Sequence, residues 1–331
     1  MASTEASTAS NVLVLLIAAA GCASSLPLHA QSYPAKTVRL IVPFAPGGPN
    51  DFLGRLVGQK MTEQMGQTVV VDNRGGAGGT VGLDVAAKSP GDGYTLAMGG
   101  TSNMAIAPSL YKKLPYDPVK DFTAIINVAH VPYALAVNPT VPAKTLKELI
   151  ALAARKPGTL SYGSSGTGSV SSLAAELLNS MSKVTIIHVP YKGTAPALTD
   201  VVAGQIDMMF ADLAVIQPHA SANKLRVIAV TGAKRLASAP ALPTIAESGL
   251  QGYDVSPWFG VVAAAGVPRD IVNRLNTVVA SGLKSPDGQQ RLHTLGYELI
   301  GGSADQFAAT IKSDVAKYGK VIRAAGIKAD L

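Results

Sequence analysis

Residues 38–53 read VRLIVPFAPGGPNDFL, and residues 160–173 read LSYGSSGTGSVSSL. In each stretch an apolar segment typical of a buried parallel strand runs into a glycine-rich turn and then into apolar residues at helical spacing. The first helical pattern continues to Met65 and is followed by Gly66, where a helix would end, and the second continues to Met181. These stretches predict two strand–turn–helix units of an α/β fold.

Glycine-rich turns in this position suit the binding of small anions. The first N–H groups of a helix have no acceptor within it, and the helix dipole places partial positive charge at that end. A carboxylate or phosphate therefore binds there without a lysine. Glycine lets the main chain approach closely, and the hydroxyls of the second turn can donate or accept hydrogen bonds. One such turn is ordinary helix capping, whereas two in matching positions indicate an anion site.

The rest of the chain continues the alternation of strands and helices. We expect further strands at 68–71, 94–98, 133–139, 184–189, 206–210, 225–231 and 258–264. The alternation predicts mostly parallel sheets, which bind ligands beyond the carboxyl ends of their strands. The tail after residue 265 is expected to hold helices at 268–283 and 303–325 and no strand, so that it packs back on the first domain. The chain would then cross between two domains near residues 130 and 255, which gives a two-strand hinge.

Length and composition limit the classes of protein that fit. The 331 residues include 47% hydrophobic and 15% charged residues, enough for a sizeable core, and the length favours two domains. The net charge of +7 is spread without a long basic run, and the aromatic residues are few. The sequence therefore predicts no nucleic-acid partner, and a mildly basic surface attracts acidic solutes.

The N-terminal segment predicts export. Residues 12–20 read VLVLLIAAA, a stretch too short for a permanent membrane anchor but typical of the core of a secretory signal. We expect cleavage after Ala30, with residues 1–30 removed, although the leading segment carries Glu5 and no basic residue. Cleavage before Cys22, the only cysteine, is the alternative; it follows a segment similar to a lipoprotein cleavage box and would leave a lipid anchor.

Motifs of catalysis and metal binding are missing from the sequence. It contains no HExxH pattern, no nucleophile elbow with an acid and base in order, and no glycine turn that continues into Lys and then Ser or Thr. It has no cysteine cluster and no paired metal ligands. The sequence therefore predicts no metal, no cofactor and no enzymatic activity. The histidines are scattered, at His29, His130, His188, His219 and His293.

Several longer blocks occur in a fixed order: YPAKTVRLIVPFAPGGPND, DNRGGAGGTVG, GDGYTLAMG, SLYKKLPYDPVKDF, LSYGSSGTGS, VPYKGTAPALTDVVAGQIDMMFAD and LRVIAVTGAKR. With these blocks the chain from about Tyr33 onward resembles the Bug (TctC-like) extracytoplasmic solute receptors of tripartite tricarboxylate transporters. The resemblance implies a two-lobed periplasmic-binding-protein (Venus flytrap) fold with two hinge crossovers. Lobe 1 would comprise residues 31–130 and 256–331, and lobe 2 residues 131–255. It also implies a periplasmic receptor that captures a small carboxylate between the lobes and delivers it to integral membrane permease subunits. We expect this receptor to be monomeric.

The resemblance also implies which residues contact the ligand. They are Phe44, Pro46, Gly47, Gly48 and Asp51 in the first turn, Gly76, Ala77, Gly78 and Gly79, Thr101 and Ser102, Ser164, Ser165, Gly166, Thr167, Gly168 and Ser169 in the second turn, and Asp212. The chain departs from the family pattern at Pro49 and Asn50, where small or hydroxyl residues are common, at Gly75 in place of proline, and at Ser172 in place of histidine. These departures concern the identity of the ligand more than its class.

Some alternatives stay open at this level. Asp51 either caps its own helix or contacts the ligand, and Asp212 either bonds to a backbone turn or contacts the ligand. An exported α/β enzyme could use the same turns as a phosphate or oxyanion site. A sensor that passes ligand-induced closure to a different membrane partner is a third hypothesis.

Overall fold

The computed structural model describes residues 33–131, 133–236 and 239–327. The predicted export signal at 1–30, with Cys22, lies outside the described residues. The chain from Lys36 onward forms one compact unit, and its strands assemble into two sheets.

The first sheet is mixed. Its strand order is β11 (Glu298–Gly301), β4 (Phe122–His130), β10 (Trp258–Ala264), β3 (Thr95–Gly100), β1 (Val38–Val42) and β2 (Val69–Asn73). Strands β2, β1 and β3 are parallel, whereas β10 runs antiparallel to β3 and β4, and β11 antiparallel to β4. Strand β1 is buried along most of its length, as its apolar sequence predicts.

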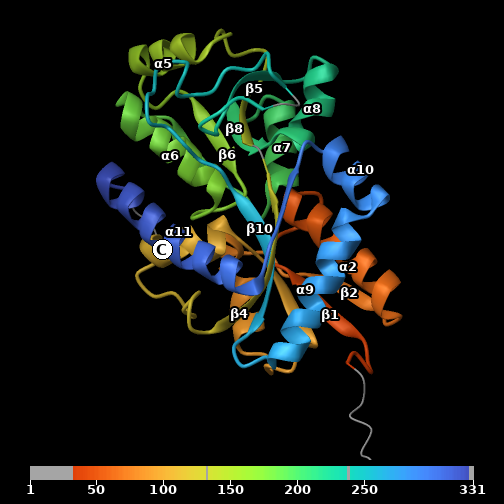
Figure 1. Ribbon diagram of the computed structural model, residues 1–331. Coiled ribbons are helices and arrows are strands. Elements are labelled where there is room, and N and C mark those ends of the chain that lie inside the picture. The colour runs from red at the N-terminus through yellow and green to blue at the C-terminus, as the bar shows by residue number, and fades with distance from the viewer. Residues whose placement is uncertain (1–32, 132, 237–238, 328–331) are drawn as a thin grey trace, which may run out of the picture. The chain divides into compact units, whose positions relative to one another are not determined.

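The second sheet has the same mixed character. Its order is β7 (Ile187–Pro190), β6 (Ser161–Ser164), β8 (Met208–Asp212), β5 (Tyr133–Val137) and β9 (Arg226–Val230). Strands β7, β6 and β8 are parallel, and β5 runs antiparallel to β8 and β9. Helices α5 and α6 lie on one side of this sheet, and α7 and α8 on the other (Figure 1). Their bounds are α5 (Leu146–Arg155), α6 (Val170–Ser182), α7 (Thr194–Val202) and α8 (Leu213–Ser221).

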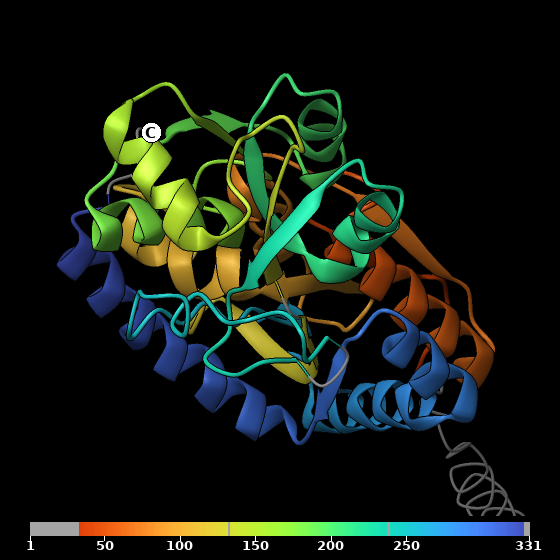
Figure 2. The same ribbon diagram turned by 90° about the horizontal axis from the view of Figure 1, so that it is seen from above.

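Helices also cover both faces of the first sheet. Helices α2 (Pro49–Met65) and α9 (Arg269–Lys284) pack together on one face, and α11 (Ala304–Ala325) crosses the other (Figures 1 and 2). The C-terminal tail therefore packs against the first sheet, as expected. The remaining elements of this part are η1 (Ala77–Gly79), α3 (Thr80–Ala87), η2 (Thr101–Ile106), α4 (Ala107–Leu110) and α10 (Pro286–Thr294).

Helix ends follow the capping signals of the sequence. Gly66 adopts the left-handed conformation after α2 and donates its N–H to Thr62 O. Thr145 with Glu148 at α5 and Ser303 with Gln306 at α11 form capping boxes.

Two expectations about the sheets are wrong. The sheets are mixed rather than mostly parallel, because apolar strand segments do not encode direction. The tail does contain a strand, β11, which pairs with β4. Strand β11 is a short edge strand with only Gly301 buried, so it lacks the apolar run that marks a buried strand.

The chain passes between the sheets at two adjacent places. β4 leads into β5, and the segment after β9 leads into β10. Val131 N–H donates to Pro257 O at 3.0 Å, and Thr231 N–H donates to Tyr133 O at 2.9 Å. These bonds hold the two connections side by side.

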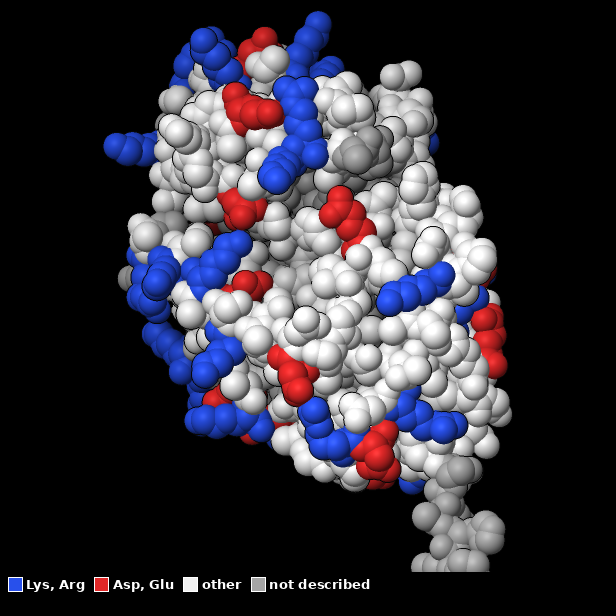
Figure 3. Space-filling view, in the orientation of Figure 1, with Lys and Arg blue, Asp and Glu red and all other residues white. Residues whose placement is uncertain are grey.

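The surface mixes both signs of charge. In Figure 3, Lys and Arg are most numerous along the edge that carries α11, with Asp and Glu interspersed over the same face. No helix of the described residues is both long and apolar enough to cross a membrane.

Candidate functional site

A small cavity lies where the turns of the two sheets face one another. It has a volume of ≈ 10 Å³, room for about one water molecule. Four of the predicted site residues line it, Phe44, Gly48, Ser102 and Ser165. The full lining is Phe44, Ala45, Gly48, Pro49, Asn50, Ser102, Tyr133, Ser165, Thr194 and Phe259.

Asp51 braces the first glycine turn from inside. Its Oδ2 accepts the N–H of Gly47 at 3.1 Å and Nε of Arg55 at 3.0 Å, and its Oδ1 accepts Nδ2 of Asn73 at 3.0 Å. Asn73 also donates to Phe44 O at 3.0 Å, so that the end of β2 is tied to the turn. Asp51 is the third residue of α2 rather than its N-cap, which is Gly48.

The environment of Asp51 favours its charged form. Burial alone would raise its pKa, but hydrogen bonds from Arg55, Asn73 and the Gly47 N–H outweigh burial and lower the pKa below 3.8. Asp51 is 4% exposed and does not line the cavity. Its contacts are those of a group that shapes the turn.

Hydroxyl groups brace the second glycine turn. Ser171 Oγ accepts the Ser165 N–H at 3.0 Å and lies 3.1 Å from Ser165 Oγ and 2.9 Å from Ser169 Oγ. Ser169 is the N-cap of α6, and its Oγ accepts the Ser172 N–H at 3.2 Å. Ser164 Oγ accepts the Gly166 N–H at 3.1 Å. The predicted donors of this turn are thus largely bonded to one another.

The two sides contact each other directly through their glycine turns. The N–H of Val170, the first residue of α6, donates to Ser102 Oγ at 2.9 Å. Tyr111 OH donates to Ala77 O or Thr167 O, at 2.9 and 2.8 Å. A Cβ added at Gly78 would lie 2.6 Å from Thr167 O, so this approach requires glycine. The Ser102 side chain, from η2 directly after β3, therefore occupies the anion position at the N-terminus of α6.

A further helix N-terminus faces the first glycine turn. Gly193 precedes α7, and a Cβ at Gly193 would lie 2.9 Å from Ala45 Cβ. A Cβ at Gly48 would lie 3.3 Å from Thr194 Oγ1, and Thr194 lines the cavity. Sequence reasoning missed this contact. The signal was present, because a strand, a turn ending in Gly193 and a helix repeat the pattern of the other two units.

The remaining predicted residues do not line the cavity. Thr101 Oγ1 accepts the Trp258 N–H at 3.0 Å and thereby joins β3 to β10. Gly76 and Gly79 adopt positive φ angles around η1, and Gly79 lies against Asn103 and Phe44. Whether the residues outside the lining contact a ligand stays a prediction. They are Pro46, Gly47, Asp51, Gly76, Ala77, Gly78, Gly79, Thr101, Ser164, Gly166, Thr167, Gly168, Ser169 and Asp212.

Asp212 joins the end of β8 to the segment that precedes β11. It is fully buried, its Oδ1 accepts the Ala214 N–H at 3.0 Å, and its Oδ2 bonds to the hydroxyl of Tyr297. Burial raises the pKa of Asp212 to about 7, although both hydrogen bonds oppose that shift. The bond to the Ala214 N–H matches the hypothesis that Asp212 bonds to a backbone turn. The bond to Tyr297 adds a contact between the part of the chain that forms the second sheet and the part that forms the first.

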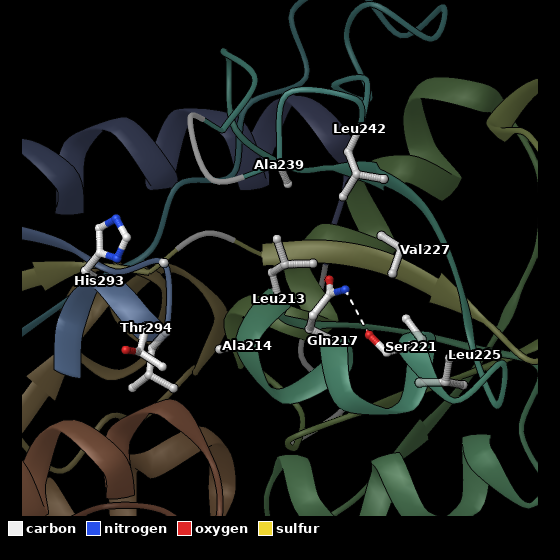
Figure 4. Close-up of a pocket in the computed structure, with 13 residues that line it drawn as sticks. Leu213, Ala214, Gln217, Ser221, Leu225, Val227, Ala239, Leu242, His293 and Thr294 are labelled. Atoms are coloured by element: carbon white, nitrogen blue, oxygen red, sulfur yellow. Dashed lines mark hydrogen bonds between the residues drawn. The ribbon is translucent and has the colours of Figure 1, made fainter. Parts of the chain in front are cut away.

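A larger hollow lies elsewhere. It measures ≈ 600 Å³ and lies between α8 with β9 on one side and residues 293–296 on the other (Figure 4). Figure 4 shows Leu213, Leu242 and Val227 around it, and Gln217 bonded to Ser221. It contains none of the glycine turns. Among the described residues, no group of three or more His, Cys, Asp or Glu side chains is placed to hold a metal ion.

Comparison with known proteins identifies the family. The profile described as tripartite tricarboxylate transporter family receptor (TctC) matches residues 53–327. The protein in the tcbD-tcbE intergenic region of Pseudomonas sp. (strain P51) is 36% identical over 293 residues, which cover 88% of this chain and 87% of that one. BugT of Bordetella pertussis is 33% identical over 318 residues, which cover 96% and 97%. The chain belongs to the TctC receptor family.

Solved structures agree with this assignment. Rpa4515 of R. palustris with adipate is 40% identical with a TM-score of 0.86, and the match covers 89% of this chain and 99% of that one. The periplasmic binding protein BugD is 34% identical with a TM-score of 0.85, covering 89% and 99%. MatC of Rhodopseudomonas palustris with bound malate is 33% identical with a TM-score of 0.84, covering 88% and 100%. The predicted two-lobed periplasmic-binding-protein fold is confirmed.

Proposed function

We propose that this member of the TctC family is an exported periplasmic receptor that captures a small carboxylate between two lobes and delivers it to membrane permease subunits. Lobe 1 comprises residues 31–130 and 256–331, and lobe 2 residues 131–255. One observation carries the proposal: the N-termini of α2, α6 and α7 approach each other from both sheets around one cavity. Each such terminus favours an anion.

The chemistry of the lining supports a carboxylate held by neutral groups. None of the residues that line the cavity is charged, and its polar side chains are hydroxyls and one amide. Ser102 from lobe 1 accepts the first N–H of α6, which is the position that a ligand carboxylate would take. Hydrogen bonds to a charged group contribute about 1.5 to 3 kcal/mol each, so a few donors from each lobe reach micromolar affinity.

Capture requires the lobes to open. A volume of ≈ 10 Å³ is far below the several hundred Å³ that ligand sites usually enclose. Individual hydrogen bonds cross the cleft between the lobes, such as that from the Val170 N–H to Ser102 Oγ and that from Tyr111 OH to Thr167 O. Such bonds can exchange for bonds to a ligand while the paired connections at Val131 and Thr231 act as the hinge.

The rival hypothesis of an enzyme fits the geometry less well. Ser164 Oγ lies 2.6 Å from Nε2 of His188, which is the spacing of a nucleophile and its base. Ser164, however, is fully buried, accepts the Gly166 N–H, and does not line the cavity. A substrate in the cavity would not reach it, so we propose a receptor without catalysis.

A thermal-shift screen of di- and tricarboxylates, with sugars as neutral controls, tests the proposal. A carboxylate at a hundred times its Kd stabilises the protein by about 2.7 kcal/mol, and chromatography should recover it unchanged. Gly48→Leu fills the cavity and should abolish the shift. Gly232→Leu is the control, because a Cβ at Gly232 meets nothing closer than 3.5 Å. A shift with sugars alone, or conversion of a bound carboxylate, would refute the proposal.

A further inference from the structure

Asn50 has an unusual environment at the N-terminus of α2. It is the second residue of this 17-residue helix, it is 4% exposed, and it lines the cavity between the lobes. Its Oδ1 has no hydrogen-bond partner among the described residues. Buried polar atoms are nearly always paired, so an unpaired one beside a cavity points to a group that enters the cavity.

The missing partner must be a hydrogen-bond donor. An amide oxygen only accepts, and a carboxylate oxygen also only accepts. A carboxylate therefore leaves Oδ1 unpaired, whereas a hydroxyl or ammonium group satisfies it. The amide nitrogen of the same side chain can meanwhile donate to a neighbouring carboxylate oxygen. One asparagine can thus bind both groups of a hydroxy acid or an amino acid.

The surrounding main chain supplies the complementary half of such a site. The N–H groups of Gly48 and Asn50 have no acceptor among the described residues, and Pro49 has no N–H. These N–H groups attract an anion at the same helix end where Oδ1 requires a donor. The site therefore combines donors for a carboxylate with one acceptor for a second group on the ligand.

We propose that Asn50 selects short carboxylates that bear a hydroxyl or ammonium group over unsubstituted carboxylates of the same length. This inference rests on the proposed receptor function and names the ligand class of the same site. The small size of the cavity favours short chains, because each added methylene requires a wider opening of the lobes.

Calorimetric titration with matched ligands tests the inference. The first set is succinate, malate and aspartate, and the second is glutarate, 2-hydroxyglutarate and glutamate. Wild-type protein should bind at least one substituted member about tenfold more tightly than the unsubstituted member, which corresponds to one additional hydrogen bond. Asn50→Leu should weaken both ligands, because it removes the amide donor to the carboxylate, and it should weaken the substituted ligand about tenfold more, which removes the preference.

Asn127 offers a matched control. It is also 4% exposed with an unpaired Oδ1, but it lies in β4 and does not line the cavity. Asn127→Leu should leave the ratio of affinities unchanged. Asn50→Asp is a second variant for the case in which Asn50→Leu does not fold, because an acidic residue suits a helix N-terminus. It should raise the preference for the amino acid over the hydroxy acid, since only the ammonium group gains from the added charge.

The outcomes separate the two proposals. Equal affinities of substituted and unsubstituted ligands, or an equal loss for both in Asn50→Leu, would overturn the role of Asn50 and leave the receptor function standing. An unchanged preference in Asn50→Asp would overturn it as well. Absence of binding for every ligand of both sets would overturn this inference, and the receptor function would fall with it only if the thermal-shift screen of di- and tricarboxylates also gave no shift.

Discussion

The two glycine turns present helix N-termini to the same cavity but are held by different chemistry. In the first turn one buried carboxylate, that of Asp51, accepts hydrogen bonds from the Gly47 N–H, Arg55 and Asn73. In the second turn the hydroxyls of Ser165, Ser169 and Ser171 form a neutral network. Hydrogen bonds to a charge are about twice as strong as neutral ones. The stability of the first turn should therefore depend on one residue and on pH. The stability of the second turn should come from several residues and should not depend on pH in the same way.

Replacement of Asp51 should have the largest effect on stability. Asp51→Ala removes the acceptor of the Gly47 N–H and of one Asn73 N–H together with the ion pair to Arg55, and should lower the free energy of unfolding by about 3 kcal/mol. The pKa of Asp51 is lowered, so its contribution is present above the unfolded value of 3.8 and is lost as pH falls through the folded value. Urea unfolding at pH 7 and pH 3 should thus show a smaller difference between variant and wild type at the lower pH.

A surface acid provides the control for this prediction. Asp305 is largely exposed and pairs with Arg269 at 2.9 Å. Asp305→Ala should cost about 0.5 kcal/mol or less, because exposed ion pairs contribute little. Equal losses for the Asp51 and Asp305 variants would show that the first turn does not depend on its charge.

A clash between the turns should have the next largest effect. Gly78 and Gly66 have similar φ angles, +64° and +68°, but a Cβ at Gly78 meets Thr167 O at 2.6 Å and a Cβ at Gly66 meets nothing within 4 Å. Both alanine variants carry the same backbone strain, and Gly78→Ala should cost about 1 to 2 kcal/mol more because the turns must separate. Small-angle scattering should show a larger radius of gyration for Gly78→Ala alone. Identical behaviour of the two variants would mean that the turns do not meet in solution.

The smallest effect is expected in the second turn. Ser171→Ala removes three contacts, but the hydroxyls of Ser165 and Ser169 can rotate to other partners, so the cost should be about 1 kcal/mol. The cost should not share the acid dependence of the Asp51 variant. Ser182→Ala, which removes one bond to Leu178 O, is the control and should cost less. A loss as large as that of Asp51→Ala would erase the contrast between the turns.

Much of the local structure could be predicted from the sequence. Apolar runs mark β1 and β10, and capping residues mark the ends of α2, α5 and α11. Some predicted strands nevertheless stop too early. β8 was expected to end at Phe210 but continues to Asp212, because backbone pairing extends past the apolar centre into polar residues. Strand β4 was not predicted at all, although it is buried along most of its length.

The candidate site was predicted only in part. Phe44, Gly48, Ser102 and Ser165 line the cavity, but so do Asn50, Tyr133, Thr194 and Phe259, which were not predicted to bind the ligand. Tyr133 and Phe259 belong to strands whose apolar character predicts core positions. Only the strand order and the crossing between sheets bring them to the turns.

The sequence by itself determined the strand–turn–helix units, their caps and the membership in a receptor family, because these depend on residues close together in the chain. The tertiary structure alone decided that α7 faces the first glycine turn, that Ser102 accepts the first N–H of α6, and that Asn50 is left with an unpaired oxygen. Those facts depend on strand order and on how the two sheets approach each other, and residues more than sixty positions apart then meet, such as Ser102 and Val170.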